Sequence, residues 1–201
     1  MLTVVGMGPA GLQWLIPAAR EAIAAAEALV GGSRHLQQFP DFAGERFALG
    51  ADMPALLAWI EARTGRRVVV LASGDPLFYG IGTRLIAHFG RERVQVIPGI
   101  SAVQYLCARA GIDMNDMWLT SSHGRSVCFD ELARHNKVAM VTDALCGPRE
   151  IAQQLIARGK GHRWMVIGEN LAMENEQIHF LPVREVNADY DMNAVVILDE
   201  R

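Results

Sequence analysis

Short apolar runs rich in β-branched residues alternate with longer helix-forming segments along the whole chain. This alternation is typical of parallel sheets whose strands are joined by crossover helices, so we expect an α/β fold. In the first half, strands are expected at residues 2–6, 28–31, 68–73 and 94–98. Helices are expected at 17–27, 53–62, 81–89 and 102–110. Most of these strand segments are nearly uninterrupted apolar runs, which predicts a mostly parallel sheet buried on both faces.

The second half repeats the pattern, with expected strands at residues 118–121, 138–142, 164–168, 177–183 and 194–198 and helices at 127–134 and 148–157. Residues 188–193 are too few for a parallel crossover, which takes about a dozen residues. We therefore expect residues 176–187 to form a hairpin with the final strand, which makes this sheet mixed. The polar segment 111–117 suggests the boundary between an N-terminal α/β lobe, 1–112, and a C-terminal α/β lobe, 113–201.

Composition excludes several classes of protein. The 19 Lys and Arg against 22 Asp and Glu leave a net charge of −3, which disfavours a nucleic-acid partner. Cys107, Cys128 and Cys146 lack metal-ligand spacing, so we expect no metal site and a reducing, cytoplasmic compartment. The uncharged start before Arg20 is interrupted by Gly and Pro, and no other apolar run approaches the ~20 residues that span a bilayer. We therefore expect no membrane association.

The loop Gly6-Met-Gly-Pro-Ala-Gly11 matches the dinucleotide fingerprint GxGxxG after a strand. That fingerprint also needs an acidic residue about 20 positions later, at the end of the second strand. Here the second strand ends in Val30-Gly-Gly-Ser-Arg34, without a carboxylate. We therefore expect the loop to line another kind of cleft, with an NAD-dependent oxidoreductase as the alternative.

The segment Ser73-Gly-Asp-Pro-Leu-Phe-Tyr-Gly80 follows a buried strand, at the carboxyl edge where open α/β sheets bind ligands. Gly74 permits close backbone approach, Asp75 supplies fixed acceptors and Pro76 stops the strand ladder. An Asp-Pro turn that only caps the next helix is the alternative.

Two later loops have the same position after a strand. In Pro98-Gly-Ile-Ser-Ala102, Ser101 can cap a helix, and the loop would lie beside Gly74 if the strands are neighbours. In Ser121-Ser-His-Gly-Arg125, an imidazole and a guanidinium flank a flexible glycine.

These loops resemble those of the tetrapyrrole methyltransferases of cobalamin and sirohaem biosynthesis. The matching pieces, in chain order, are Val5-Gly-Met-Gly-Pro9, Ser73-Gly-Asp-Pro76, Pro98-Gly-Ile-Ser101 and Ser122-His-Gly-Arg125. The residues of Ser73–Gly80, Ser121–Arg125 and Gly168-Glu-Asn-Leu171 are similar to those of the C5-methyltransferase branch, which acts on precorrin-6Y or cobalt-precorrin-7. The resemblance covers the whole chain and implies a stand-alone enzyme that methylates a corrin-pathway macrocycle at C5.

The resemblance also implies two α/β lobes with S-adenosylmethionine between them. The residues carried over as cofactor-binding are Gly74, Asp75, Pro76, Leu77, Ser101, Ala102, Thr142, Asp143, Ala144, Leu145, Asn193 and Ala194. Relatives often carry an aromatic residue where this chain has Asp143-Ala144. The atoms through which that segment meets the cofactor are therefore an open point.

The implied chemistry asks for positioning rather than a nucleophilic side chain, because a methyl group on a sulfonium is already activated. His123 is the candidate for taking up the proton that leaves C5, and orienting its own loop is the alternative role. The macrocycle's carboxylates call for guanidinium groups, for which Arg34, Arg125 and Arg149 are candidates; each could equally be a solvated surface residue. Gly8 and Pro9 would border the macrocycle.

The resemblance further implies a homodimer, and a separate protein for C15 methylation and decarboxylation. Other readings remain open: a relative that acts on another precorrin position, on RNA or on a protein, and a tetrapyrrole-binding protein without catalysis.

Overall fold

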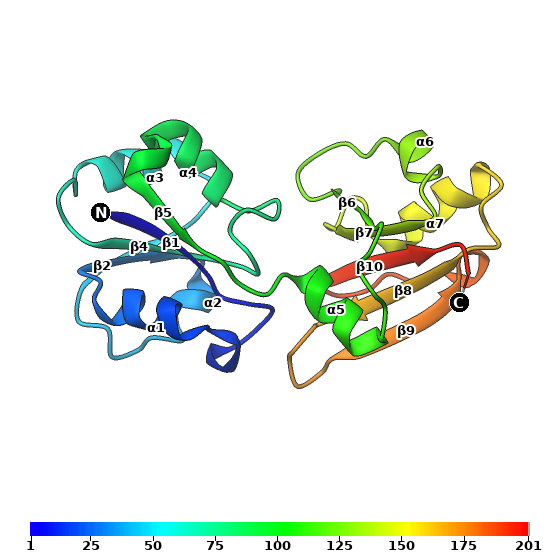
Figure 1. Ribbon diagram of the computed structural model, residues 1–201, viewed down its shortest axis with the longest axis horizontal. Helices are drawn as coiled ribbons and strands as arrows, with labels where there is room; N and C mark the ends of the chain where they lie inside the picture. The colour runs from blue at the N-terminus through cyan, green and yellow to red at the C-terminus, as the bar shows by residue number, and fades with distance from the viewer. Residues whose placement is uncertain (201) are drawn as a thin grey trace. The chain divides into compact units, whose positions relative to one another are not determined.

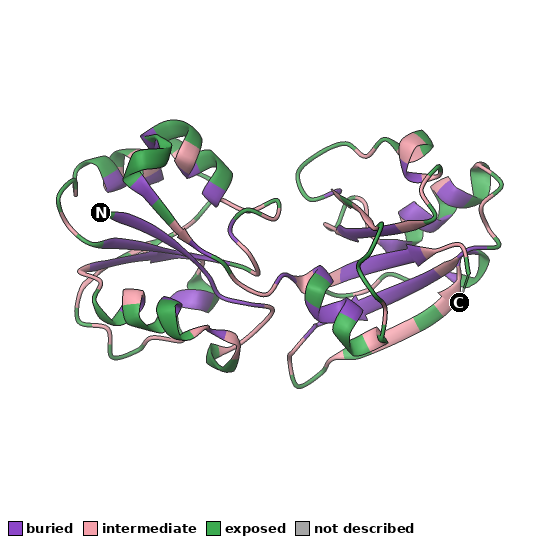
Figure 2. Ribbon diagram, viewed as in Figure 1, coloured by how far each residue is buried: buried purple, intermediate pink, exposed green. Residues whose placement is uncertain are grey.

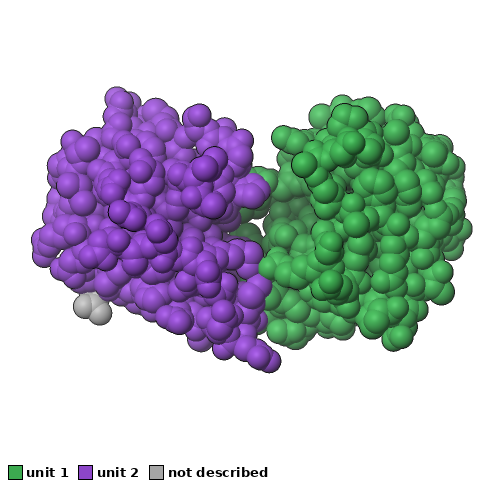
Figure 3. All heavy atoms as spheres, turned by 180° about the vertical axis from the view of Figure 1, so that it is seen from behind, with its two compact units in different colours: residues 1–101 green, residues 102–201 purple. Residues whose placement is uncertain are grey.

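The computed structural model describes residues 1–200, and the chain divides into two compact units (Figure 3). Unit 1 comprises Met1–Ser101 and unit 2 comprises Ala102–Arg201. This boundary lies earlier than the expected one, because helix α5 (Ala102–Ala110) belongs to unit 2. Its buried face, which includes Val103 and Leu106, packs against the sheet of unit 2. Each unit combines a five-stranded sheet with helices, so the predicted α/β class is confirmed.

The sheet of unit 1 is entirely parallel, with the strand order β3-β2-β4-β1-β5. Its strands are β1 (Leu2–Gly6), β2 (Ala28–Gly31), β3 (Glu45–Ala48), β4 (Val68–Ala72) and β5 (Val94–Ile97). Every residue of β1, β2 and β4 is buried, as their uninterrupted apolar runs predicted (Figure 2). The edge strand β3 was missed, because its four residues, Glu-Arg-Phe-Ala, begin with two charged side chains and form no apolar run.

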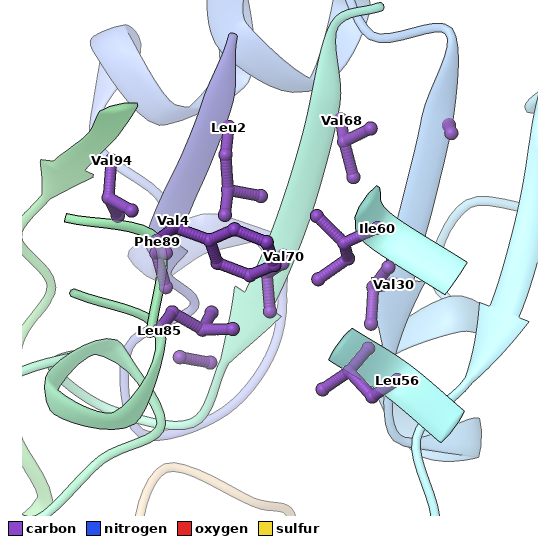
Figure 4. Close-up of a cluster of buried hydrophobic side chains, with 12 residues drawn as sticks. Leu2, Val4, Val30, Leu56, Ile60, Val68, Val70, Leu85, Phe89 and Val94 are labelled. Carbon is purple, nitrogen blue, oxygen red and sulfur yellow. The ribbon is translucent and has the colours of Figure 1, made fainter. Parts of the chain in front are cut away.

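Helices cover both faces of this sheet (Figure 1). They are α1 (Pro17–Ala24), α2 (Ser33–Leu36), α3 (Met53–Glu61) and α4 (Gly82–Phe89), with short 3-10 turns η1 (Leu12–Trp14) and η2 (Arg91–Arg93). Leu56 of α3 and Phe89 of α4 pack with Val4 and Val70 on one face (Figure 4). Residues of α1 and α2 pack on the opposite face, so both faces of each central strand are covered.

The sheet of unit 2 is mixed, as predicted, with the order β6-β7-β10-β8-β9. Its strands are β6 (Trp118–Ser121), β7 (Lys137–Val141), β8 (Trp164–Glu169), β9 (Gln177–Pro182) and β10 (Asn193–Leu198). β6 runs parallel to β7, whereas β10 is antiparallel to both β7 and β8. The expected hairpin of β9 with the final strand is wrong, because β9 pairs with β8. β10 is almost wholly buried and takes the centre, whereas β9 has no buried residue and suits the edge.

Unit 2 also contains α6 (Phe129–Leu132), α7 (Pro148–Ala157) and the turn η3 (Val183–Glu185). Leu132, Ile151 and Leu155 from α6 and α7 join one core with Met140 and Val195 of the sheet. Within residues 1–200, no helix is both long enough and apolar enough to cross a bilayer.

Candidate active site

Gly6 and Gly99 bring the carboxyl ends of β1, β4 and β5 into close contact. A Cβ atom on Gly6 would lie 2.5 Å from the Cα of Gly99 and 2.6 Å from the carbonyl oxygen of Gly74. Such distances are far inside van der Waals contact, so only glycine permits this approach. The loop after β5 therefore meets the loop after β4, as expected, although β1 lies between the two strands.

The loop after β1 is joined to the loop after β4 by a pair of backbone hydrogen bonds. Gly8 N donates to Gly74 O at 3.2 Å, and Gly74 N donates to Gly8 O at 3.0 Å. The chain then forms the turn η1 before α1 begins at Pro17. A dinucleotide turn passes directly into its helix, so this longer loop differs from that site, as its two prolines suggested.

Asp75 organises the loop after β4. Its Oδ1 accepts hydrogen bonds from Leu77 N at 2.8 Å and Phe78 N at 3.2 Å, and its Oδ2 accepts one from Gly99 N at 3.1 Å. The carboxylate thus shapes its own turn and also ties the neighbouring loop to it. Pro76 is buried, whereas the side chain of Leu77 is 51% exposed and free to offer apolar surface to a ligand.

Asp143 plays the same part in unit 2, after β7. Its Oδ1 accepts from Leu145 N and Cys146 N, both at 3.0 Å, and its Oδ2 accepts from Gly124 N at 2.9 Å. The hydrogen bond from Gly124, followed by those from Cys146 and Leu145, holds the pKa of Asp143 below its usual value. Ala144 and Leu145 protrude beyond this turn, and Leu145 is 91% exposed.

Thr142 connects this turn to the start of β10. Its Oγ1 lies 2.6 Å from Asn193 Oδ1 and 2.9 Å from Asn193 O. Ala194 is buried and pairs with Val141 and Gly168. The expected residues at positions 142–145 and 193–194 therefore lie together, where β7 ends and the antiparallel β10 begins.

His123 and Arg125 lie on the exposed turn that Gly124 fastens to Asp143. The turn begins at Ser121, whose Oγ accepts from His123 N at 3.0 Å. Ser122 Oγ also donates to Cys146 O at 2.8 Å. Hydrogen bonds between side chains and backbone thus orient this turn, and His123 and Arg125 are both exposed on it.

The remaining expected residues are more dispersed. Arg34 is exposed on α2, and Arg149 is exposed near the start of α7, with Nη1 3.8 Å from Asp189 Oδ2. Ser101 is buried, and Ala102 begins α5. Most residues predicted for the cofactor thus lie in the loops after β4 and β5 of unit 1, or after β7 and at the start of β10 of unit 2, whereas Arg34 and Arg149 lie on helices.

Two features were missed in the sequence. Glu169 Oε1 accepts from Asp191 N at 2.6 Å, and Asn170 N donates to Met192 O at 2.8 Å, so these residues fix the chain that enters Asn193. Glu169 and Asn170 both lie in the motif Gly168-Glu-Asn-Leu171. This motif was noted in the sequence only for its similarity to the C5-methyltransferase branch, and no structural role was predicted for it. The second feature is His35, which carries no sequence pattern and is buried at 7% exposure.

Comparison with known proteins gives consistent matches. A family model for tetrapyrrole (corrin/porphyrin) methylases matches residues 1–187. A cobalt-precorrin-7 C(5)-methyltransferase of Salmonella typhimurium is 77% identical over 201 residues, 100% of both chains. A decarboxylating precorrin-6Y C(5,15)-methyltransferase of Sinorhizobium sp is 32% identical over 180 residues, 88% of this chain and 44% of that protein. The crystal structure of a precorrin-6Y methylase of Archaeoglobus fulgidus has a TM-score of 0.77 at 25% identity and covers 98% of this chain and 97% of that one. The likeness therefore extends over both units.

Proposed function

The chain belongs to the tetrapyrrole (corrin/porphyrin) methylase family, and we propose that it transfers a methyl group from S-adenosylmethionine to C5 of cobalt-precorrin-7 in cobalamin biosynthesis. The observation that carries this proposal is the 77% identity, over 100% of both chains, to an enzyme of that name. Precorrin-6Y, the substrate named for the more distant Sinorhizobium relative, is the alternative substrate.

The residues present fit S-adenosylmethionine. This group has a flat adenine and several polar atoms, which suit a site made of close-packed backbone and exposed apolar side chains. We propose that Gly74, Asp75, Pro76, Leu77 and Ser101 hold it from unit 1. From unit 2 we propose the residues Ala102, Thr142, Asp143, Ala144, Leu145, Asn193 and Ala194. Asp75 and Asp143 would act by holding their turns, since their described hydrogen bonds go to backbone N–H groups.

The bound cofactor supplies a methyl group that is activated by the positive charge on sulfur. The protein then needs to hold donor and acceptor in line, and the electron-rich C5 carbon of the macrocycle is the nucleophile. This chemistry needs no cysteine nucleophile, and the properties of Cys107 and Cys146 agree with that. Burial raises the pKa of the Cys107 thiol to about 11 and raises that of Cys146, so both remain protonated and unreactive at neutral pH.

Substrate recognition is proposed to rest on cations and on the first glycine loop. Arg34 and Arg125 would bind peripheral carboxylates of the macrocycle, while Gly8 and Pro9 border it. Arg149 is the weaker candidate, because Asp189 already lies beside its guanidinium. His123, exposed on the turn that Asp143 fastens, is proposed to accept the proton that leaves C5.

The test is incubation of the protein with cobalt-precorrin-7, precorrin-6Y and earlier intermediates, each with S-adenosylmethionine labelled in its methyl group. We expect one labelled methyl group on cobalt-precorrin-7, located at C5 by fragmentation in the mass spectrometer. A label at another carbon would assign a different precorrin methyltransferase. Macrocycle binding without label transfer would indicate a carrier protein.

Three further proposals concern partners and location. The Salmonella relative is named for C5 methylation, whereas the Sinorhizobium relative is named for C5 and C15 methylation with decarboxylation, so we infer that a separate protein carries out the C15 methylation and decarboxylation. We also infer a homodimer, which light scattering of the purified protein would test, and a cytoplasmic location, which suits the free cysteines Cys107, Cys128 and Cys146.

A further inference from the structure

A buried histidine contacts the loop that follows β4. The Nε2 atom of His35, in α2, lies 3.4 Å from Ser73 Oγ. α2 follows β2 and Ser73 follows β4, and these two strands are neighbours in the parallel sheet. Both residues therefore lie at its carboxyl edge, where the candidate active site of unit 1 is formed. Neither residue has a part in the function proposed above.

The local sequence places His35 where it can reach Ser73. A Cβ atom on Gly31, the last residue of β2, would lie 3.1 Å from Leu71 Cβ and 3.5 Å from His35 Cβ. The absence of a side chain at this position gives α2 room to fold back over the sheet. Burial and the nearby charge of Arg34 lower the pKa of His35 to about 4, so the imidazole is neutral at neutral pH.

A neutral imidazole carries one N–H group. When this proton is on Nε2, it donates to Ser73 Oγ, and the hydroxyl proton of Ser73 is then available to a second acceptor. Ser73 is exposed, so that acceptor can belong to a ligand. Gly74, the next residue, is held by two hydrogen bonds to Gly8, so the backbone that carries the hydroxyl is also fixed.

The two sides of this loop are directed toward different parts of the sheet. Asp75 connects it to Gly99, on the β5 side, with the residues proposed for the cofactor. Ser73 connects it to His35, on the β2 side, where Arg34 lies. A hydroxyl donor suits a carboxylate acceptor, and carboxylates are the peripheral groups of the proposed macrocycle.

We propose that Ser73 donates a hydrogen bond to a carboxylate of the macrocycle and that His35 is the positioning residue that orients its hydroxyl. This inference rests on the proposed function and assigns part of its substrate specificity to the pair. It predicts a loss of macrocycle affinity without loss of cofactor affinity when either member of the pair is removed.

The test compares Ser73→Ala, His35→Phe, the double variant and His35→Gln, which keeps a side-chain N–H donor. We expect Ser73→Ala and His35→Phe each to raise the KM for the macrocycle roughly tenfold, the loss of one hydrogen bond to a charged group. The double variant should be no worse than either single variant, because His35 acts through Ser73. His35→Gln should recover part of the loss. S-adenosylhomocysteine affinity, measured by calorimetry, should stay unchanged in all four.

Thermal unfolding checks that each variant is folded. Ser73 is exposed, so Ser73→Ala carries the test even if His35→Phe is unstable. An unchanged KM in Ser73→Ala, additive losses in the double variant, or an equal loss of S-adenosylhomocysteine affinity would overturn the inference while the wild type remains active.

Nitrogen NMR of the imidazole gives a readout that is independent of activity. We expect the Nε2–H form in the wild type and a shifted Nε2 resonance in Ser73→Ala. The Nδ1–H form would contradict the inference. A wild type that neither binds nor methylates the macrocycle, yet shows the Nε2–H form and its shift, would instead refute the proposed function.

Discussion

Asp75 and Asp143 make equivalent hydrogen bonds in the two units. Each Oδ1 accepts from the backbone N–H groups two and three residues further along the chain, and each Oδ2 accepts from a glycine of another loop, Gly99 or Gly124. In both turns the leucine two residues after the aspartate is exposed, Leu77 in one and Leu145 in the other. Each unit thus uses one carboxylate to shape a turn and to join it to a second loop.

If Asp75 holds a cofactor loop, Asp75→Ala should weaken S-adenosylhomocysteine binding. We expect a loss of roughly tenfold, because a hydrogen bond to a charged group contributes about 1.5–3 kcal/mol and part of that will appear as lower stability. Asp52 is a matched control, since its carboxylate also accepts a backbone N–H, from Ala55 at the start of α3. Asp52→Ala should cost about 1 kcal/mol of stability and leave affinity unchanged. Unchanged affinity in folded Asp75→Ala would reduce Asp75 to a turn residue.

Asp143 should contribute stability that depends on pH. Its pKa is lowered in the folded protein, so the carboxylate stabilises the fold above the unfolded value of about 3.9 and loses this effect as the pH falls through the lower folded value. Asp143→Asn should therefore lower the thermal stability near pH 7, and the difference from the wild type should shrink below about pH 4. Thermal unfolding across this range measures it. A difference that persists at low pH would show that the carboxylate's charge is unimportant.

Arg125→Ala should weaken macrocycle binding by roughly ten- to hundredfold, the range for a charge-assisted hydrogen bond, with little effect on S-adenosylhomocysteine. Arg125→Lys should recover only part, because an ammonium lacks the planar pair of donors. Arg134, which is exposed in the same unit and pairs with Glu131, provides a control whose replacement by alanine should change neither affinity. Equal losses for both ligands in Arg125→Ala would indicate a disrupted turn instead.

Arg163 should be important for the stability of unit 2. Its side chain is fully buried, with Nε 2.6 Å from Asp199 Oδ1 and Nη2 donating to the carbonyls of His135 and Asn136. Asp199→Ala would leave this charge buried without its counterion, and we expect a loss of about 3–5 kcal/mol at most, since Asp199 is partly exposed. Urea unfolding followed by tryptophan fluorescence measures it, because Trp118 and Trp164 lie in unit 2. A loss below about 1 kcal/mol would match an ordinary surface pair.

S-adenosylhomocysteine should raise the melting temperature, whereas NAD should not. A ligand at a concentration 100 times its Kd stabilises the native state by about 2.7 kcal/mol. Stabilisation by NAD alone would contradict the assignment of both glycine loops, Gly6–Gly11 and Ser73–Gly80.

The strands were predictable because their signal is local. An apolar, β-branched run between glycine or proline residues specifies a buried strand whichever strands pair with it, and β1, β2, β4 and β5 appear within a residue of their expected ends. The loops at their carboxyl ends follow from the same reasoning. The family could also be recognised, because its loop motifs are continuous in the sequence.

Strand partners and helix positions depended on the tertiary structure. The burial pattern of α5 suits either sheet, and β9 can form a hairpin with the strand before it or the strand after it. The contact between His35 and Ser73 exists only because β2 and β4 are neighbours. Many strand pairings satisfy the same local sequence pattern. Which strands pair is decided by the packing of the whole unit, because only one arrangement buries all of its apolar side chains in one core.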